Sequence, residues 1–181
     1  MRYFLGFLVS VGLIVLVFIL VLHDFSSPKP VGPPLVNIAN TDSTVQMTEQ
    51  GPLVADQNFQ GYRITIGQSE SEISTLQGYQ DTVTSTKIYN NNEQGYAQFL
   101  RALDFAGFQK GSKASANSDD RGYCPSGDRY VFEIISGGQD TERFWKTSCG
   151  QGNYGGSLSQ TALLFRNQIP DYDDLTGSLN L

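Results

Sequence analysis

Cys124 and Cys149 are the two cysteines of the 181-residue chain, and they stand 25 positions apart. Two thiols can form a disulfide or contribute to a metal site, but a zinc site takes about four ligands. The single histidine, His23, is remote in sequence, so we expect no metal. A disulfide closing such a loop would stabilise the fold by roughly 3.5 kcal/mol in the chain-entropy account. We therefore predict a Cys124–Cys149 disulfide in an oxidising compartment.

Three carboxylates, Asp171, Asp173 and Asp174, lie close together near the C-terminus. Such a cluster can bind a cation or perform acid–base chemistry, although it is also typical of a charged turn after a helix. We keep the three as cation or acid–base candidates. No catalytic residue is assigned, because His23 precedes the predicted domain and Ser-His or Cys-His catalysis needs a histidine within it.

The glycine-rich stretch 150–155 matches the pattern G-x-G-x-x-G. A dinucleotide site would need a parallel βαβ unit around this pattern, whereas the preceding strand is predicted to belong to an antiparallel hairpin. We therefore expect no cofactor. Free backbone N–H groups before a helix could still hold a small anion. The candidate residues of this anion nest are Gly152, Gly155, Gly156 and Ser157.

An apolar run covers residues 3–22, where 16 of 20 side chains are Phe, Leu, Ile or Val. A helix of about 20 residues spans the core of a bilayer, and no small-x-small cleavage pattern follows the run. Arg2 precedes it and Asp24 follows it, which favours a cytoplasmic N-terminus. We predict a single-pass signal anchor over residues 1–23, with the C-terminal part extracytoplasmic.

Gly6-Phe7, near the start of this run, resembles the processing site of pilins, a family in which a C-terminal disulfide over a sheet is common. The resemblance implies a pilus-like assembly subunit. Two positions depart from the family pattern. Val11 stands where pilins carry a glutamate, and prolines from Pro28 onward would end a helix that pilins continue.

Residues 24–42 are predicted to form a Pro-rich linker, with four prolines between positions 28 and 34. Such a segment favours an extended conformation of about 3.1 Å per residue. Residues 43–181 then form the folded domain.

The domain is predicted to be α+β, with a mostly antiparallel sheet and two helices, in the order four strands, helix, two strands, helix. Period-two alternation indicates strands. The six segments are 43–49, 61–67, 71–76, 82–89, 129–136 and 141–148.

Two helices are predicted from apolar spacing of about 3.6 residues. Tyr96, Phe99, Leu100 and Leu103 form the first stripe, with Asn91 and Gln94 as the capping pair and Gly107 as the stop. The second helix begins at a capping box of Ser157 and Gln160 and ends before Pro170. Its apolar face consists of Leu158, Ala162, Phe165 and Ile169.

The last two strands flank the turn 137–140 and form a hairpin. In the simplest register, Trp145 joins Phe132 on the core face. Cys149 is four residues after Trp145, so it would point to the same face at the end of the strand.

The formal net charge of −6 disfavours nucleic acid and anionic headgroups as partners of the folded part. We expect a membrane-anchored, non-catalytic binding or assembly module of the cell envelope, attached to the lipid bilayer through residues 3–22. Its partner would be an envelope or surface protein or a glycan. The alternatives are a glycan hydrolase that uses paired carboxylates, with Glu70, Glu72, Glu133 and Glu142 as further candidates, and the pilin-like subunit.

Overall fold

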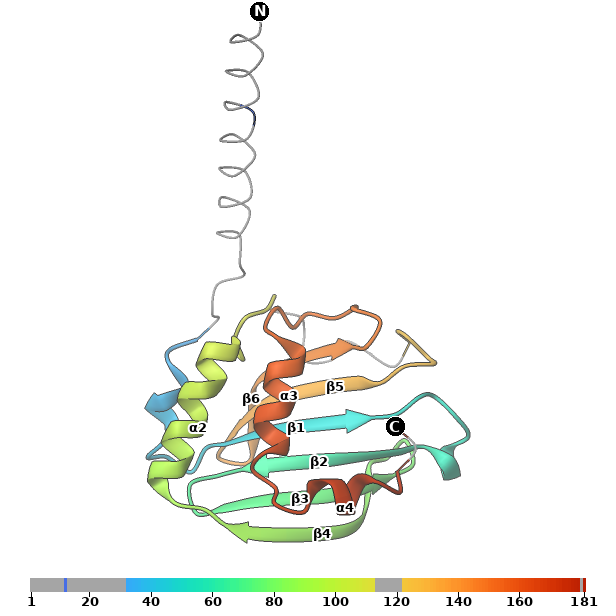
Figure 1. Ribbon diagram of the computed structural model, residues 1–181, viewed down its shortest axis with the longest axis horizontal. Helices are drawn as coiled ribbons and strands as arrows, with labels where there is room; N and C mark the ends of the chain where they lie inside the picture. The colour runs from blue at the N-terminus through green and yellow to red at the C-terminus, as the bar shows by residue number, and fades with distance from the viewer. Residues whose placement is uncertain (1–11, 13–31, 113–121, 180) are drawn as a thin grey trace, which may run out of the picture.

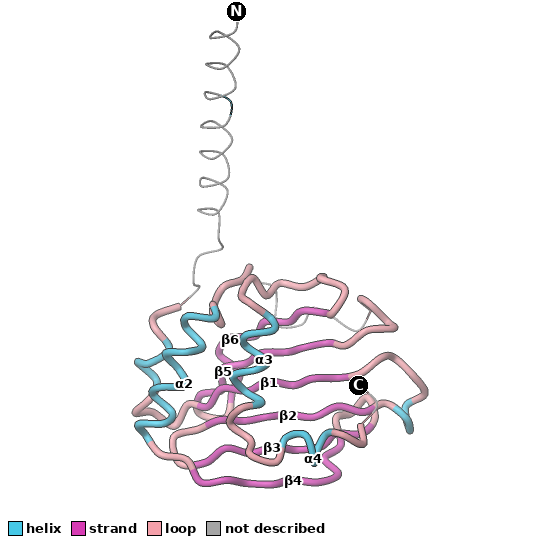
Figure 2. The backbone as a smooth tube through the Cα atoms, viewed as in Figure 1, coloured by secondary structure: helices cyan, strands magenta, loops and turns pink. Residues whose placement is uncertain are grey.

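A computed structural model describes Gly12, residues 32–112, residues 122–179 and Leu181. In these parts the chain forms one antiparallel six-stranded sheet with helices on one of its faces (Figure 1). The helices lie on the near side of the strands (Figure 2), so this is a two-layer α+β architecture. The predicted fold class of the domain is confirmed.

The strand order in the sheet is β4-β3-β2-β1-β5-β6, and every neighbouring pair is antiparallel. The strands are β1 (Thr44–Gln50), β2 (Gln60–Ile66), β3 (Glu70–Gln77), β4 (Thr82–Asn90), β5 (Arg129–Ser136) and β6 (Gln139–Thr147). All six predicted strands are present, each within a few residues of its predicted bounds.

Three α-helices occur in the described residues: α2 (Glu93–Ala106), α3 (Leu158–Arg166) and α4 (Tyr172–Thr176). Two short 3-10 helices, η1 (Leu35–Ile38) and η2 (Asp56–Asn58), complete the order. The sequence predicted α2 and α3, whereas α4 is a further single turn and a half of helix in the acidic C-terminal segment. Its five residues are too few for an apolar period to be recognised.

The core lies between the helices and the sheet. The predicted stripe of α2 is buried in full. Phe99 of this stripe meets Phe165 of α3 edge to face, with ring centroids 5.2 Å apart. These rings pack on alternate residues of the central strands, whose side chains on that face are also buried. The strand residues concerned are Val45, Met47, Tyr62, Ile64, Ile66, Phe132 and Ile134.

The caps of the two long helices differ in detail from the predicted ones. Asn92, and not Asn91, caps α2, because its side chain accepts the Gly95 N–H at 2.9 Å. The Asn91 side chain instead donates to the Gly67 carbonyl. Ser157 is the N-cap of α3 as predicted, but its side chain makes no capping hydrogen bond.

The predicted register of the last hairpin is wrong by one residue. Phe132 pairs with Phe144, so Trp145 lies opposite Val131 on the face away from the helices. The turn consists of Gly137 and Gly138, both at positive φ. Ile135 pairs with Asp140 and Ile134 with Glu142, so Thr141 of β6 is an extra, bulged residue. One extra residue in a strand moves every later side chain to the other face of the sheet.

The folded domain begins earlier than the predicted boundary at residue 43. Leu35 and Ala39 are buried in the core, and the Leu35 N–H donates to the Asp104 carboxylate of α2 at 3.0 Å. The second half of the predicted linker is therefore part of the domain. The hydrogen-bond acceptor, Asp104, is 69 residues away in sequence, so the composition of the linker does not predict this contact.

The predicted anchor over residues 3–22 lies outside the described residues, apart from Gly12. No helix in the described parts combines the length and the apolar character needed to cross a membrane.

The glycine-rich segment before α3 packs closely against the end of α2. Gly155 donates its N–H to the Lys110 carbonyl at 2.7 Å, and Ser157 donates to the Ala106 carbonyl at 2.9 Å. Gly156 lies so close to this helix end that a Cβ there would overlap the Gly107 carbonyl oxygen and the Tyr154 hydroxyl. The two helices can meet at this point because residue 156 has no side chain.

We predict that Gly156→Ala lowers the free energy of unfolding by about 1–3 kcal/mol, because the new methyl group overpacks the contact between the helix ends. Gly122→Ala is the matched control, since a Cβ at position 122 meets no atom within 4 Å. Urea unfolding of both variants, each with its disulfide intact, measures the difference in free energy of unfolding. Equal stability of the two variants would contradict the close contact at Gly156.

Candidate functional site

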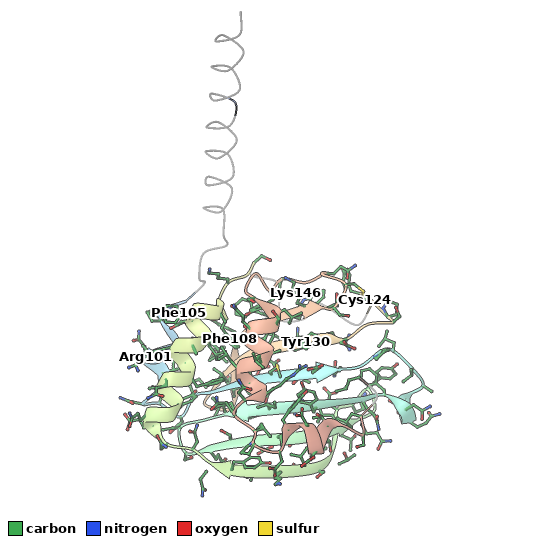
Figure 3. The ribbon with its side chains drawn as sticks, in the orientation of Figure 1. Arg101, Phe105, Phe108, Cys124, Tyr130 and Lys146 are labelled. Carbon is green, nitrogen blue, oxygen red and sulfur yellow. A yellow bond between two sulfur atoms is a disulfide. The ribbon has the colours of Figure 1, made fainter. Side chains whose placement is uncertain are left out.

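The disulfide joins Cys124 to Cys149, with the two Cα atoms 5.9 Å apart. It closes the end of the sheet where β6 finishes and β5 begins, and Figure 3 shows Cys124 at this end of the molecule. Cys149 follows β6 in an exposed turn and does not point into the core as the predicted register implied. The predicted pairing is confirmed, and its role is to fix the chain entering β5.

The three C-terminal carboxylates do not form a metal-binding group. Asp171 precedes α4 and pairs with the Lys87 ammonium group of β4, while Asp173 and Asp174 lie in the first turn of α4. The hydrogen bond from Lys87 is the main cause that lowers the pKa of Asp171. No cluster of metal-ligating side chains is found in the described residues.

Several backbone N–H groups of the predicted anion nest are used in hydrogen bonds within the fold. The N–H groups of Gly155 and Ser157 bind carbonyl oxygens at the end of α2, and Gly152 forms an antiparallel bridge with Lys146 of β6. Backbone groups that are engaged in this way are not offered to an anion. The segment connects β6 to α3 and covers part of the β6 edge.

A buried ionic cluster lies on the helix side, at the end of β1. Glu49 is only 4% exposed, and its carboxylate accepts hydrogen bonds from the Tyr62 hydroxyl and, at 2.7 Å, from the Arg166 guanidinium of α3. Arg166 also donates to the Tyr62 oxygen at 3.1 Å, and the Tyr172 hydroxyl donates to the same oxygen at 2.9 Å. The cluster thus ties β1, β2, α3 and α4 together.

The electrostatics of this cluster keep Arg166 charged and Tyr62 neutral. Burial, and then the Glu49 charge, raise the pKa of Tyr62 well above its ordinary value of 10.0. Burial, the largest single cause, lowers the pKa of Arg166, but the hydrogen bond and charge of Glu49 and the interactions with Tyr62 together outweigh it and raise the pKa. A neutral tyrosine and a permanently charged arginine are suited to structural support of the carboxylate.

The opposite face of the sheet carries polar side chains, because the α-helices of the described domain lie on the first face (Figure 1). Cross-strand partners share a face, so the register places these side chains together. We call this surface the polar face. Its members are Gln46, Thr48, Gln50, Arg63, Thr65, Glu72, Ser74, Arg129, Glu133, Arg143, Trp145 and Thr147.

Hydrogen bonds run across the strands of the polar face. In one row, Gln46 donates to Glu133 at 2.8 Å, and Arg143 donates to the other oxygen of Glu133 at 3.2 Å. In a second row, Arg129 donates twice to the Gln50 side-chain oxygen, at 2.8 and 3.0 Å. The Gln50 amide in turn donates to Asp81 in the turn after β3, at 2.7 Å. These bonds hold the side chains of the face in fixed orientations.

A cavity of about 250 Å³ opens on the polar face. Its walls carry two arginines and two carboxylates, and the rings of Phe59 and Tyr79 stand at one end with centroids 4.4 Å apart. The full lining is Thr48, Gln50, Phe59, Arg63, Tyr79, Asp81, Val131, Glu133 and Arg143. The formal charges balance, so the cavity offers many donors and acceptors without a net charge.

Two groups on this face are poorly solvated. Burial is the largest cause that raises the pKa of Glu133, followed by the charge of Asp140, while Arg143 and Gln46 oppose the shift. The Trp145 indole packs against the ring of Tyr123 in a tilted arrangement, with ring centroids 5.2 Å apart. Its Nε1 is buried and has no hydrogen-bond partner in the part of the chain that the structure describes.

The sequence analysis did not predict the polar face. It assigned the alternate apolar residues of each strand to the core and the intervening polar residues to solvent. One signal was present. β1 alternates Val45 and Met47 with Gln46 and Thr48, and the structure buries both sets. Burial of the polar set depends on neighbours from β2 and β5, which the sequence of β1 does not reveal.

The chain matches no protein-family model, and no curated protein resembles it in sequence at a significant level. The fold and the site therefore define a class only: a disulfide-closed α+β domain whose second sheet face is polar.

We predict that Arg166→Met destabilises the protein by about 3–5 kcal/mol, because it leaves the buried Glu49 carboxylate without its cation. The additional change Glu49→Gln should restore most of this loss. Lys87→Met, which removes the cation of the exposed pair with Asp171, is the control and should leave the unfolding midpoint nearly unchanged. A double-mutant cycle by urea unfolding tests this, and additive effects of the Arg166 and Glu49 changes would contradict the coupling.

Proposed function

We propose that this chain is a membrane-anchored, extracytoplasmic binding module of the cell envelope, and that its ligand contacts the polar face. The supporting observation is the cavity between Arg63, Asp81, Glu133 and Arg143, where side chains pre-oriented by cross-strand hydrogen bonds surround an accessible space. Pre-orientation lowers the entropic cost of binding.

The chemistry of the cavity favours a neutral ligand that is rich in hydroxyl groups. Two positive and two negative side chains surround it, so a strongly charged ligand would meet as much repulsion as attraction. Arg, Gln, Thr and carboxylate groups can together donate to and accept from hydroxyls. Cavities for whole drug-sized ligands measure roughly 300–1,000 Å³, so this smaller one suits a single unit of a longer chain. We infer that the ligand is a segment of envelope glycan.

We expect neutral oligosaccharides to bind the polar face and Arg63→Gln to weaken that binding at least several-fold, because Arg63 lines the cavity and donates to Thr48 at 3.3 Å. The measurement is a titration of the full chain in detergent with chitotetraose, cellotetraose and maltotetraose, followed by NMR shifts and calorimetry. Arg101→Gln is the matched control, since Arg101 lies on the exposed outer side of α2 (Figure 3).

Binding that maps to the polar face in the wild type, and that is preserved in Arg101→Gln, supports the proposal. Shifts confined to the helix side, or no binding by any of the three glycans, would contradict it.

A glycan hydrolase is the second candidate, and one observation favours it. Asp81 and Glu133 line the same cavity, and the pKa of Glu133 is raised, as in a general acid. Both carboxylates are nevertheless bound by arginine and glutamine side chains, which suits fixed hydrogen-bonding groups better than groups that exchange protons. Release of shorter products from the same oligosaccharides would favour the hydrolase.

The disulfide supports the extracytoplasmic location, because such bonds persist in oxidising compartments. In cells that produce the full chain, we expect it to remain in membranes after a carbonate wash, with both cysteines protected from maleimide until they are reduced. A cytosolic protein with two reactive thiols would contradict this location. An intact mass that retains residues 1–6 would separate the anchor from a pilin-like subunit, which loses them.

A further inference from the structure

One apolar side chain differs from all others on the surface of the described domain. Phe105 is 92% exposed, far more than any other large apolar side chain of the described residues. It lies one residue before the end of α2, and the helical period places it on the side opposite to the buried stripe. Scattered apolar residues are common on protein surfaces, but an aromatic ring with this exposure gains from any contact that removes it from water.

The surroundings of Phe105 are basic. Gln98, Arg101 and Phe105 follow one another at spacings of three and four residues, and all three are exposed, so they form one row on the outer side of α2. Figure 3 shows Arg101 and Phe105 along this side of the helix. The side chain of Lys110 lies beside Gly107 at the end of α2 and adds a second cation. We call Arg101, Phe105 and Lys110 the α2 tip.

The described chain begins beside the α2 tip. The Leu35 N–H donates to Asp104, the residue before Phe105, and η1 packs beside α2 (Figure 1). Gly32 lies so close to Gln109, just past the end of α2, that a Cβ at position 32 would overlap the Gln109 amide nitrogen. The chain therefore enters the domain at the same end of α2 that carries the exposed ring.

The length of the chain before this entry limits how far the α2 tip can lie from a bilayer. This step rests on the anchor of the proposed function, which ends at residue 23. Residues 24–31 connect the anchor to the domain. At about 3.1 Å per residue, this connection spans roughly 25 Å. A short tether acts as a high local concentration, so even a weak contact between the α2 tip and the bilayer would be populated.

We propose that the α2 tip docks on the bilayer that holds the anchor, with the Phe105 ring at the boundary between headgroups and acyl chains. Aromatic rings are favoured at that depth, and Arg101 and Lys110 can reach lipid phosphates beside it. The net charge of −6 disfavours an anionic surface for the domain as a whole, so these cations select one end of it. α2 covers the sheet face opposite to the cavity, so this docking leaves the polar face open to a ligand (Figure 1).

The docking can be measured with tryptophan reporters in the full chain, inserted in vesicles of phosphatidylcholine and phosphatidylglycerol. Part of the phosphatidylcholine carries bromine on its acyl chains, which quenches tryptophan at close range. Phe105→Trp places a reporter in the α2 tip. Ile88→Trp is the matched control, because Ile88 is also exposed but lies on the edge strand β4. After subtraction of the wild-type signal from Trp145, we expect quenching of Phe105→Trp to be at least three-fold stronger than that of Ile88→Trp.

A second set of variants tests whether Phe105 holds the helix at the surface. Gln98→Trp places the reporter two turns before Phe105 in the same exposed row. In this background, we expect Phe105→Leu to retain most of the quenching. Phe105→Glu should reduce it at least three-fold, because a carboxylate is unfavourable at the edge of the acyl chains. Thermal unfolding confirms that both variants are folded.

Equal quenching of Phe105→Trp and Ile88→Trp would overturn the proposal, as would equal quenching in the folded Phe105→Leu and Phe105→Glu variants. Protection of the Phe105→Trp reporter from aqueous acrylamide without quenching by brominated lipid would also overturn it, because a protein would then cover the α2 tip. Only chain that floats with the vesicles is measured. Absence of quenching there overturns the docking alone, whereas a chain that does not float overturns the anchor and the docking together.

Discussion

The antiparallel pairing of β1 with β5 is the contact on which the rest of the structure depends. It joins two units that are each local in sequence, the β2–β3–β4 meander and the β5–β6 hairpin. Val45 pairs with Ile134 across a separation of almost 90 residues, so the entropic cost of closing this loop must be met by the contacts it allows. Both faces of β1 are buried, Gln46 and Thr48 as well as Val45 and Met47.

Burial of both faces gives the sheet two different interiors. On the helix side, apolar side chains meet α2 and α3, and the buried carboxylate of Glu49 is paired with Arg166. On the other side, no helix of the described residues supplies apolar contacts, and polar groups bind one another across the strands through Glu133, Gln46 and Gln50. A buried polar group must find a partner, and this requirement fixes the side chains that line the cavity.

The ends of the sheet are secured by separate means. The disulfide fixes the entry to β5, while the glycine-rich segment before α3 covers the β6 edge and meets the end of α2 through Gly156. Among the described residues, no strand or segment pairs with the outer edge of β4, and its one cation, Lys87, is engaged by Asp171. In the described part of the chain, the sheet is therefore covered at its β6 edge and open at its β4 edge.

Local patterns in the sequence determined six strands, the two longer helices and the cysteine pair, because period, capping residues and residue type act over a few positions. Tertiary structure decided the strand order, the position of Leu35 in the core and the face on which Trp145 lies. The bulge at Thr141 shows why: a single added residue reverses the parity of a strand, and no local pattern records it. The cavity is likewise set by pairing, since Asp81, Glu133 and Arg143 come together only through contacts between residues that are distant in sequence.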